Sequence, residues 1–248
     1  MSAPAPPGGR IDAIDLARTV ALVGMGVFHL VYDLEMFGHL PPGTAVTGGW
    51  RILSYAVAGS FLFLAGVSLH LAHGQGLRWR AYLRRLLTIT GAAGLVSLGT
   101  WVMFPASFVY FGILHSIAAA SILGLAFLRL PAALTLAAAG GLLLMAQTGL
   151  GLAPSLRGIW LDWTGLTASP RPSVDYVPLV PWLAPFLAGL GLAGLMARAG
   201  LWAQLERRRA AAPPIRWLAW PGRHSLAIYL LHQPVLIGLV WAGTHLGG

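Results

Sequence analysis

The chain contains no cysteine, no lysine and few charged residues of either sign. Without cysteine it has no disulfide bond, no thiol nucleophile and no cysteine-ligated metal site. Charged residues make up 9% of the sequence and hydrophobic residues 57%, whereas roughly 25% of residues are charged in an ordinary soluble domain. This composition excludes a soluble domain of 248 residues and predicts a membrane protein that crosses the bilayer several times.

Two further absences narrow the function. No glycine-rich loop stands between a strand and a helix, which excludes a nucleotide-binding fold of that type. No set of histidine and acidic residues has recognisable ligand spacing, so we expect no metal. The sixteen basic residues, all arginine, give a net charge of +9, but they are spread between apolar runs. We therefore attribute them to membrane topology and expect no nucleic-acid partner.

Seven apolar runs are each long enough to cross the roughly 30 Å of membrane hydrocarbon as a helix. We therefore predict an all-α, polytopic membrane helix bundle with about seven transmembrane helices, and a short interfacial helix within residues 153–176. Residues 1–13 are predicted to be a flexible tail. Residues 14–248 are predicted to form a single transmembrane domain, whose first helix is a retained span and not a signal peptide. The predicted spans are 14–33, 51–73, 82–104, 108–128, 131–152, 177–199 and 223–246.

The arginines predict the orientation. Twelve of them fall in the tail and in the connections after the second, fourth and sixth spans, and three fall in the other connections, at Arg51, Arg157 and Arg171. Connections rich in arginine stay in the cytoplasm. We therefore predict a multi-pass protein of the bacterial inner membrane, in contact with membrane lipids, with its N-terminus in the cytoplasm and its C-terminus outside.

The first predicted span carries four ionisable side chains in an otherwise apolar helix. Because an α-helix turns by about 100° per residue, Arg18 and His29 lie on one face, about 16 Å apart along the axis. Asp15 lies one turn before Arg18, and Asp33 lies one turn after His29. Ionisable side chains inside a membrane are costly unless they face protein or a water-filled cavity, so this row predicts a functional site.

His29 and Asp33 are the predicted catalytic pair. A carboxylate beside an imidazole can fix its tautomer and stabilise its charged form, as a general base requires. The alternative is a buried histidine bonded to a backbone carbonyl. Asp15 and Arg18 are predicted either to bind a ligand or to neutralise each other as an ion pair at the helix entry.

Two later spans add polar residues to the predicted cavity. His115, in the apolar fourth span, either lines the cavity or packs as a hydrogen-bonded residue. Asp175 and Tyr176 stand at the outer mouth of the sixth span, where Asp175 either binds a hydroxyl- or amine-bearing acceptor or caps the helix. Prolines at 178, 181 and 185 predict an irregular start to that span, and broken backbone at membrane depth lines a cavity or is buried in protein.

The seventh span carries the last polar group. His232 and Gln233 lie near the middle of the membrane, with Tyr229 one turn earlier. Pro234 cannot donate a hydrogen bond to the carbonyl of Leu230. The freed carbonyl, together with the histidine and the glutamine, predicts a polar pocket that binds substrate.

Five stretches resemble, in order, the bacterial family named for the catalytic domain of heparan-alpha-glucosaminide N-acetyltransferase. They are RIDAIDLARTVALVGMGVFHLVYDLEMFG, SFLFLAGVSL, FGILHSIA, VDYVPLVPWL and GRHSLAIYLLHQPVL. The likeness runs from Arg10 to Leu236. The spacing from Arg18 to His29 also resembles the first-helix motif of acyltransferase-3 membrane proteins, and IYLLHQP resembles their late histidine motif.

The resemblance implies an acetyltransferase that moves an acetyl group from cytosolic acetyl-CoA to a sugar or similar small-molecule or glycan acceptor at the outer side. It implies that His29 is the essential histidine. In our hypothesis Asp33 orients His29, and Arg18 holds the coenzyme or the carbonyl oxygen on the cytoplasmic side. Direct transfer and transfer through an acetyl-histidine both stay open. The relatives have more spans than the seven predicted here, and a homodimer is one way for a shorter chain to complete its site.

One alternative stays open beside the enzyme. Polar residues near mid-membrane and proline-interrupted helices suit a transporter, or a lipid- or glycan-binding membrane protein, equally well. Such a protein uses the same cavity without covalent chemistry. Acetyl-CoA separates the two classes, because an acyltransferase is stabilised by it and releases coenzyme A.

Overall fold

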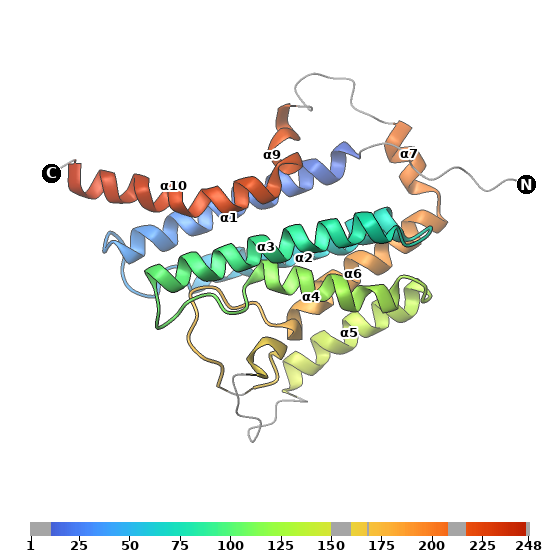
Figure 1. Cartoon of the computed structure of the whole chain (residues 1–248), viewed down its shortest axis with the longest axis horizontal. Helices are drawn as coiled ribbons and strands as arrows, with labels where there is room; N and C mark the ends of the chain where they lie inside the picture. Colours follow the sequence, from blue (N-terminus) through green and yellow to red (C-terminus); the bar gives the residue numbers. More distant parts are fainter. Residues whose placement is uncertain (1–10, 150–159, 168, 208–216, 247–248) are drawn as a thin grey trace, which may run out of the picture. The chain divides into compact units, whose positions relative to one another are not determined.

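A computed structural model describes residues 11–149, 160–167, 169–207 and 217–246. The chain divides into two compact units, which are described separately. Unit 1 combines the two ends of the chain, Met1–Phe61 and Trp202–Gly248, and unit 2 is the middle, Leu62–Leu201. Every described element is a helix (Figure 1). The predicted all-α architecture is therefore confirmed for the described part of the chain.

Unit 1 is built around the first and last helices. Its elements are α1 (Asp12–Met36), the first half of α2 (Gly48–His73), most of α7 (Leu201–Arg207), α9 (Trp220–Arg223) and α10 (Ser225–Leu246). Helix α1 packs against both α9 and α10, and α1 and α10 lie side by side (Figure 1). Side chains near the start of α1 meet α9, whereas those near its end meet α10 at residue 233 and beyond. The two long helices therefore run in the same direction.

Unit 2 packs its remaining helices around α6. Its elements are the second half of α2, α3 (Trp79–Met103), α4 (Ile113–Phe127), α5 (Ala132–Thr148), the 3-10 turn η1 (Asp162–Thr164) and α6 (Leu179–Arg198). Helix α6 packs against α4 and α5, and α3 packs against α4. The ring of Phe186 on α6 is fully buried and forms the centre of this core.

Two glycines allow α2 and α6 to approach closely within unit 2. A Cβ atom on Gly66 would collide with the backbone carbonyl of Phe186, and one on Gly189 would collide with the carbonyl of Phe63. This reciprocal pair brings two backbones into contact, as small residues do in membrane helix packing. Without a side chain at either position, the second half of α2 lies directly on α6.

Each of the seven predicted spans contains a helix, and five of the described helices are long and apolar enough to cross a membrane: α1, α2, α3, α6 and α10. The chain is therefore a multi-pass membrane protein. Helices α4 and α5 are apolar but have only 15 and 17 residues, or roughly 22 and 25 Å at 1.5 Å per residue. The count of seven spans and the orientation of the ends stay predictions. The final predicted residues of the fifth span, 150–152, lie outside the described residues, as do tail residues 1–10.

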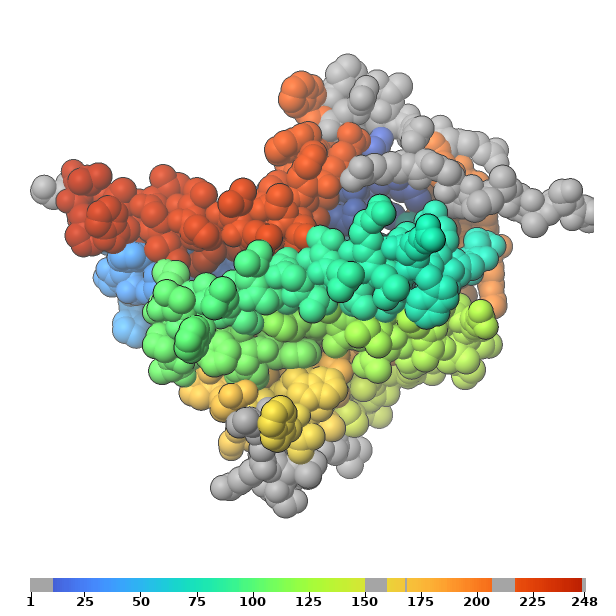
Figure 2. Space-filling model, in the orientation of Figure 1, coloured from blue at the N-terminus to red at the C-terminus, as the bar shows by residue number. Residues whose placement is uncertain are grey.

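Exposed apolar side chains lie along α3. In Figure 2 this helix forms part of the visible surface of unit 2. Its exposed residues include Leu87, Leu95, Leu98 and Val102, the first of which is 70% exposed. An apolar helix face of this length without protein cover is suited to hydrocarbon and not to water.

The predicted irregular start of α6 is confirmed. Val180 has non-helical backbone angles, φ −101° and ψ 122°, and the Val180–Pro181 bond is cis. The fourth helix also differs from its prediction, because it begins at Ile113 and not near residue 108. Residues 104–112 form an irregular connection in which the N–H of Val174 donates to the carbonyl of Ser107 (2.8 Å) and that of Val177 to Phe111 (3.0 Å). These bonds replace the helical ones. Within the region predicted to hold an interfacial helix, the described part contains only η1.

Candidate functional site

A hydrogen bond between two polar side chains joins α1 to α10 inside unit 1. Asp33 is fully buried, and its Oδ1 accepts a hydrogen bond of 2.7 Å from Nε2 of Gln233. The two residues are 200 positions apart in the sequence. A buried carboxylate is stabilised by such a donor, and the carboxylate in turn fixes the orientation of the amide.

The imidazoles of His29 and His232 meet one turn away from this bond. Their ring centroids are 4.8 Å apart, with the rings inclined at 60°. Four buried polar atoms around this point have no hydrogen-bond partner among the described residues: Nδ1 of His29, Oδ2 of Asp33, Nε2 of His232 and Oε1 of Gln233. Buried polar atoms are nearly always paired in folded proteins, so this cluster of unpaired ones is the candidate site in unit 1.

The tautomer of His232 follows from its backbone contact. Its Nδ1 is hydrogen-bonded to the carbonyl oxygen of Tyr229. A carbonyl only accepts, so Nδ1 carries the proton and Nε2 of the neutral ring is left with its lone pair. Pro234 lies inside α10, as predicted. The arrangement gives His232 the form of a base whose reactive nitrogen is buried and unpaired.

The predicted pair of Asp33 and His29 is not joined by a hydrogen bond among the described residues. The one described bond of the Asp33 carboxylate goes to Gln233, and Nδ1 of His29 has no described partner. The i, i+4 spacing places the two residues on the same face of α1, but the facing helix supplies the actual partners. The prediction of their catalytic roles is not tested by this geometry.

At the other end of α1, four charged residues form an ion-pair cluster with α9. Asp15 is 1% exposed, and its carboxylate meets Arg18 at 2.9 Å and Nε of Arg223 at 3.6 Å. Arg223 also contacts Asp12 at 2.9 Å. A buried carboxylate held between two guanidinium groups has its charge compensated. This geometry agrees with the predicted ion pair between Asp15 and Arg18 at the start of α1. A ligand-binding role for the two residues stays a prediction.

Helix α9 approaches the same end of α1 very closely. The hydroxyl of Thr19 donates to the carbonyl of Leu218 (2.9 Å) and accepts from the N–H of Gly222 (3.0 Å). A Cβ atom on Gly222 would collide with the carbonyl oxygen of Asp15. Buried Leu22 and Met25 lie on α1 between this end and His29.

His115, in unit 2, is held in a chain of hydrogen bonds. Its Nδ1 accepts from the N–H of Gly112 (3.3 Å), and its Nε2 lies 3.2 Å from Oγ of Ser97. Because Nδ1 is an acceptor, Nε2 of the neutral ring carries the proton and donates to Ser97. The Ser97 hydroxyl then donates to the carbonyl of Val109 (2.6 Å). His115 therefore ties the start of α4 to α3.

Asp175 caps the start of α4, although it belongs to the segment that leads into α6. Its Oδ2 accepts from the N–H of Ile113 (3.2 Å), and a Cβ atom on Gly112 would collide with that oxygen. Burial raises the pKa of Asp175 to about 6, against the opposing effect of the Ile113 N–H. A buried carboxylate favours its neutral form for this reason.

Tyr176 belongs to a neighbouring group of polar and aromatic residues in unit 2. Its hydroxyl donates to the carbonyl of Asp162 (2.6 Å). The carboxylate of Asp162 meets Arg171 at 2.9 Å, and that guanidinium lies over the ring of Tyr110, 4.4 Å from its centroid. Burial, with smaller effects from Tyr176 and Asp162, raises the pKa of Tyr110 to about 12. The group stabilises the connections that precede α4 and α6.

The sequence model for the catalytic part of heparan-alpha-glucosaminide N-acetyltransferase matches residues 10–234. The chain belongs to this family. Membership agrees with the five long apolar helices and makes the chain a multi-pass membrane protein of an acetyltransferase family. No curated protein and no solved structure matches it. Among the described residues, no three histidine, cysteine or acidic residues form a group that could hold a metal ion.

The structure brings together four of the sequence-predicted residues, His29, Asp33, His232 and Gln233, and pairs two others, Asp15 and Arg18. The remaining three, His115, Asp175 and Tyr176, belong to unit 2. The ion pair between Arg223 and Asp15 was not predicted from the sequence. Arg223 was used only to predict on which side of the membrane its connection lies. Its place in the stretch GRHSLAIYLLHQPVL, which also carries His232, was the signal that could have found it.

Proposed function

We propose that the chain is a membrane acetyltransferase that uses acetyl-CoA as donor and the imidazoles of α1 and α10 as its reactive groups. The observation that carries the proposal is the cluster of unpaired, buried polar atoms on His29, Asp33, His232 and Gln233. It lies inside the region that matches the acetyltransferase family. A purely structural hydrogen-bonded cluster would leave far fewer of these atoms without a partner.

The reaction needs a base and a site for a carbonyl oxygen. An amine or hydroxyl of the acceptor attacks the thioester carbonyl of acetyl-CoA, the carbon–sulfur bond breaks, and the proton lost by the acceptor balances the one gained by the coenzyme thiolate. A neutral imidazole with a free lone pair can carry that proton. His29 is the proposed catalytic base, and Nε2 of His232, 4.8 Å away measured between ring centroids, is the second proton carrier.

Asp33 and Gln233 position the reacting groups. Oδ1 of Asp33 holds the Gln233 amide, which leaves Oδ2 to accept a hydrogen bond from an acceptor hydroxyl or ammonium group. The family name supports an amino sugar as the acceptor class, and the predicted orientation would put this part of α1 toward the outer side. The ion-pair cluster of Asp15, Arg18 and Arg223 holds α9 on α1.

The first test uses acetyl-CoA with the purified full chain in detergent. We expect acetyl-CoA to raise the melting temperature and, with glucosamine as the probe acceptor, to release coenzyme A that a thiol reagent detects. The same incubation without acceptor separates two routes, because a stoichiometric burst of coenzyme A indicates an acetyl-histidine intermediate. Stabilisation without any release of coenzyme A, with or without acceptor, would favour the transporter or binding-protein alternative and contradict the proposal.

A further inference from the structure

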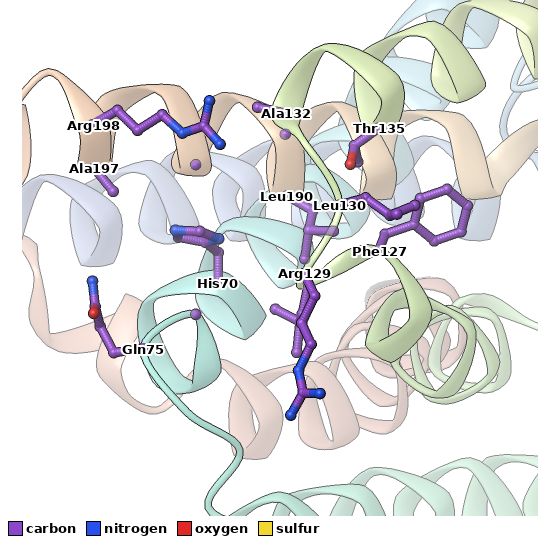
Figure 3. A pocket seen from close by; sticks show the side chains of 14 residues that line it. His70, Gln75, Phe127, Arg129, Leu130, Ala132, Thr135, Leu190, Ala197 and Arg198 are labelled. Atoms are coloured by element: carbon purple, nitrogen blue, oxygen red, sulfur yellow. The ribbon is translucent and has the colours of Figure 1, made fainter.

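The four unpaired polar atoms of the candidate site in unit 1 are closed to solvent. All four are buried, and Asp33 as a whole is 0% exposed. The cavity of about 480 Å³ in unit 2, whose lining includes His70 and Arg198, contains none of the four residues (Figure 3). A substrate cannot react with atoms that it cannot reach, so part of the protein around the site has to move before an acceptor binds.

The two helices that carry the site are held together at two levels. Arg223 pairs with Asp12 and Asp15 at the start of α1, and the bond from Gln233 to Asp33 joins α1 to α10 at the site itself. Separating the helices would break ion pairs and leave buried polar groups without partners, which is costly. The motion is therefore more easily supplied by a connection at the surface.

Residues 37–47, here called the strap, connect α1 to α2 within unit 1 and begin four residues after Asp33. The strap also contacts α10, because Nε2 of His39 lies 2.7 Å from Oγ1 of Thr244. Thr244 follows Gln233 by 11 residues, or roughly 16 Å along the helix. The strap and the last residues of α10 lie at the same end of unit 1 (Figure 1). The strap therefore bridges from α1 to the part of α10 beyond the site.

A carboxylate of α1 holds the strap from the other side. Oε1 of Glu35 accepts from the N–H of Gly43 (2.6 Å), and its Oε2 accepts from the N–H of Ala45 (2.7 Å). Ala45 is 1% exposed, so the strap is folded onto unit 1. Hydrogen bonds at exposed or partly exposed positions contribute little net free energy, because water replaces the lost partner. The strap can therefore be released without unfolding the helices.

Two glycines at the ends of the strap allow its backbone to move. Gly38 near its start and Gly48 directly after it have positive φ angles, 79° and 51°. A Cβ atom at either position would meet no described atom within 4 Å, so the backbone conformation and not close packing accounts for glycine there. Hinges are a few loop or element-terminal residues that absorb such changes in φ and ψ. Both ends of the strap have this character.

We propose that the strap closes the α1–α10 pair beyond Asp33 and opens, by releasing Thr244 and Glu35, to admit the acceptor. This inference rests on the proposed function. The strap and the cluster of Asp15 with Arg223 are at opposite ends of α1. In the predicted orientation acetyl-CoA arrives at the end of that cluster, so the strap controls entry of the acceptor and not of the donor. A closed strap also excludes water, which would otherwise hydrolyse the thioester.

The strap can be locked chemically, because the chain has no cysteine. His39→Cys and Thr244→Cys are combined in the full chain in detergent, and a short bis-methanethiosulfonate joins the two thiols through disulfide bonds that a phosphine later cleaves. Acetylated glucosamine is measured by mass spectrometry. We expect its formation to fall about tenfold or more in the locked chain, since a closed lid excludes the acceptor, and to return after cleavage. Acetyl-CoA should stabilise the locked and the released chain equally.

Each single variant treated with the same reagent is the matched control, because it carries the adduct without a tether. Both should transfer at the rate of the unaltered chain. Equal transfer by the locked and the released chain would overturn the proposal. An equal loss in a single variant would assign the effect to the adduct and overturn it too, and a pair of thiols that the reagent does not join would contradict the contact between the strap and α10.

Hydrogen exchange tests the opening without any activity. The amides of Gly43 and Ala45 are protected by the Glu35 carboxylate. Their exchange should be about tenfold or more faster than at buried Leu22 and Met25 in the middle of α1, since local opening needs less free energy than global unfolding. Glu35→Gln should raise it further and the lock should lower it. Exchange as slow as in α1 would overturn the strap even in an active enzyme, whereas an inactive chain with an opening strap would contradict the proposed function alone.

Discussion

The buried carboxylate of Asp33 accepts a hydrogen bond from Gln233, a residue 200 positions away in the sequence. Its position in an apolar helix predicted a functional or paired residue, and it is fully buried with one oxygen bonded to Gln233 and the other unpaired. One oxygen is therefore structural and the other is available for a ligand. Removing either partner of the bond leaves the other without its hydrogen bond in a buried place.

A double-mutant cycle tests this bond. Asp33→Ala and Gln233→Ala should each destabilise the chain, and the double variant should be destabilised by less than the sum of the two. The coupling should be about 1 kcal/mol, since hydrogen bonds between membrane helices contribute roughly 0.6–1.7 kcal/mol. The measurement is the free energy of unfolding in mixed detergent micelles. Additive effects would show that the bond does not contribute.

Asp175 predicts a pH dependence of stability. Burial raises its pKa from 3.8 to about 6 in the folded chain, so the folded state holds its proton more tightly than the unfolded state does. The stabilising contribution is complete below pH 3.8 and is lost as the pH rises through about 6. The side chain of the Asp175→Asn variant stays neutral at every pH. The melting temperature of this variant minus that of the unaltered chain should therefore increase from pH 4.5 to pH 7.5. A constant difference over that range would contradict the assignment.

At the scale of helices, the sequence predicted which segments are helical better than it predicted which helices pack together. Each of the seven apolar runs contains a described helix, because a helix inside a membrane must satisfy its own backbone hydrogen bonds. The late start of α4 was missed because it depends on Asp175, 62 residues from Ile113, and on space at Gly112. Likewise, the polar positions of α1 and α10 were predictable from composition, whereas the Asp33–Gln233 pairing was not, since it depends on the register in which the two helices pack.

Gly66 gives the sharpest test of helix packing. Gly66→Ala places a methyl group against the backbone of Phe186, which cannot move without shifting α6. We expect a loss of roughly 1–3 kcal/mol, as for other overpacked sites. Gly59→Ala in the same helix is the control, because a Cβ atom there meets no described atom within 4 Å. Alanine favours the helix by up to about 1 kcal/mol, so the control should be neutral or stabilised. Equal losses in both variants would contradict the close approach.

At the scale of the whole molecule, the direction of the helices bears on topology. Helices α1 and α10 run in the same direction, which requires an odd number of crossings counted from the first to the last. Both the five long helices and the predicted seven spans satisfy this requirement. An odd number of spans would put the ends on opposite sides of the membrane, and the arginine distribution predicts the cytoplasm for the N-terminus.

The absence of cysteine makes this topology directly measurable. Ala106→Cys lies in the connection between α3 and α4, and Ala199→Cys follows α6; both positions are exposed. In intact cells we expect a membrane-impermeant maleimide to label the first variant and to label the second only after the membrane is permeabilised. The opposite pattern would reverse the orientation, and labelling of both in intact cells would exclude the predicted number of crossings between them.

The most direct test of the account compares two histidine variants in coenzyme A release from acetyl-CoA with glucosamine as probe acceptor. His29→Ala removes the proposed base on α1. His224→Ala removes an exposed histidine that bonds only the carbonyl of Trp220 among the described residues. The loss of a general base lowers turnover by about 10²–10⁴-fold. The turnover of His29→Ala should therefore fall by about 10²-fold or more, while its melting temperature and its stabilisation by acetyl-CoA stay unchanged. His224→Ala should retain full activity. Turnover in His29→Ala equal to that of the unaltered chain would contradict the central claim.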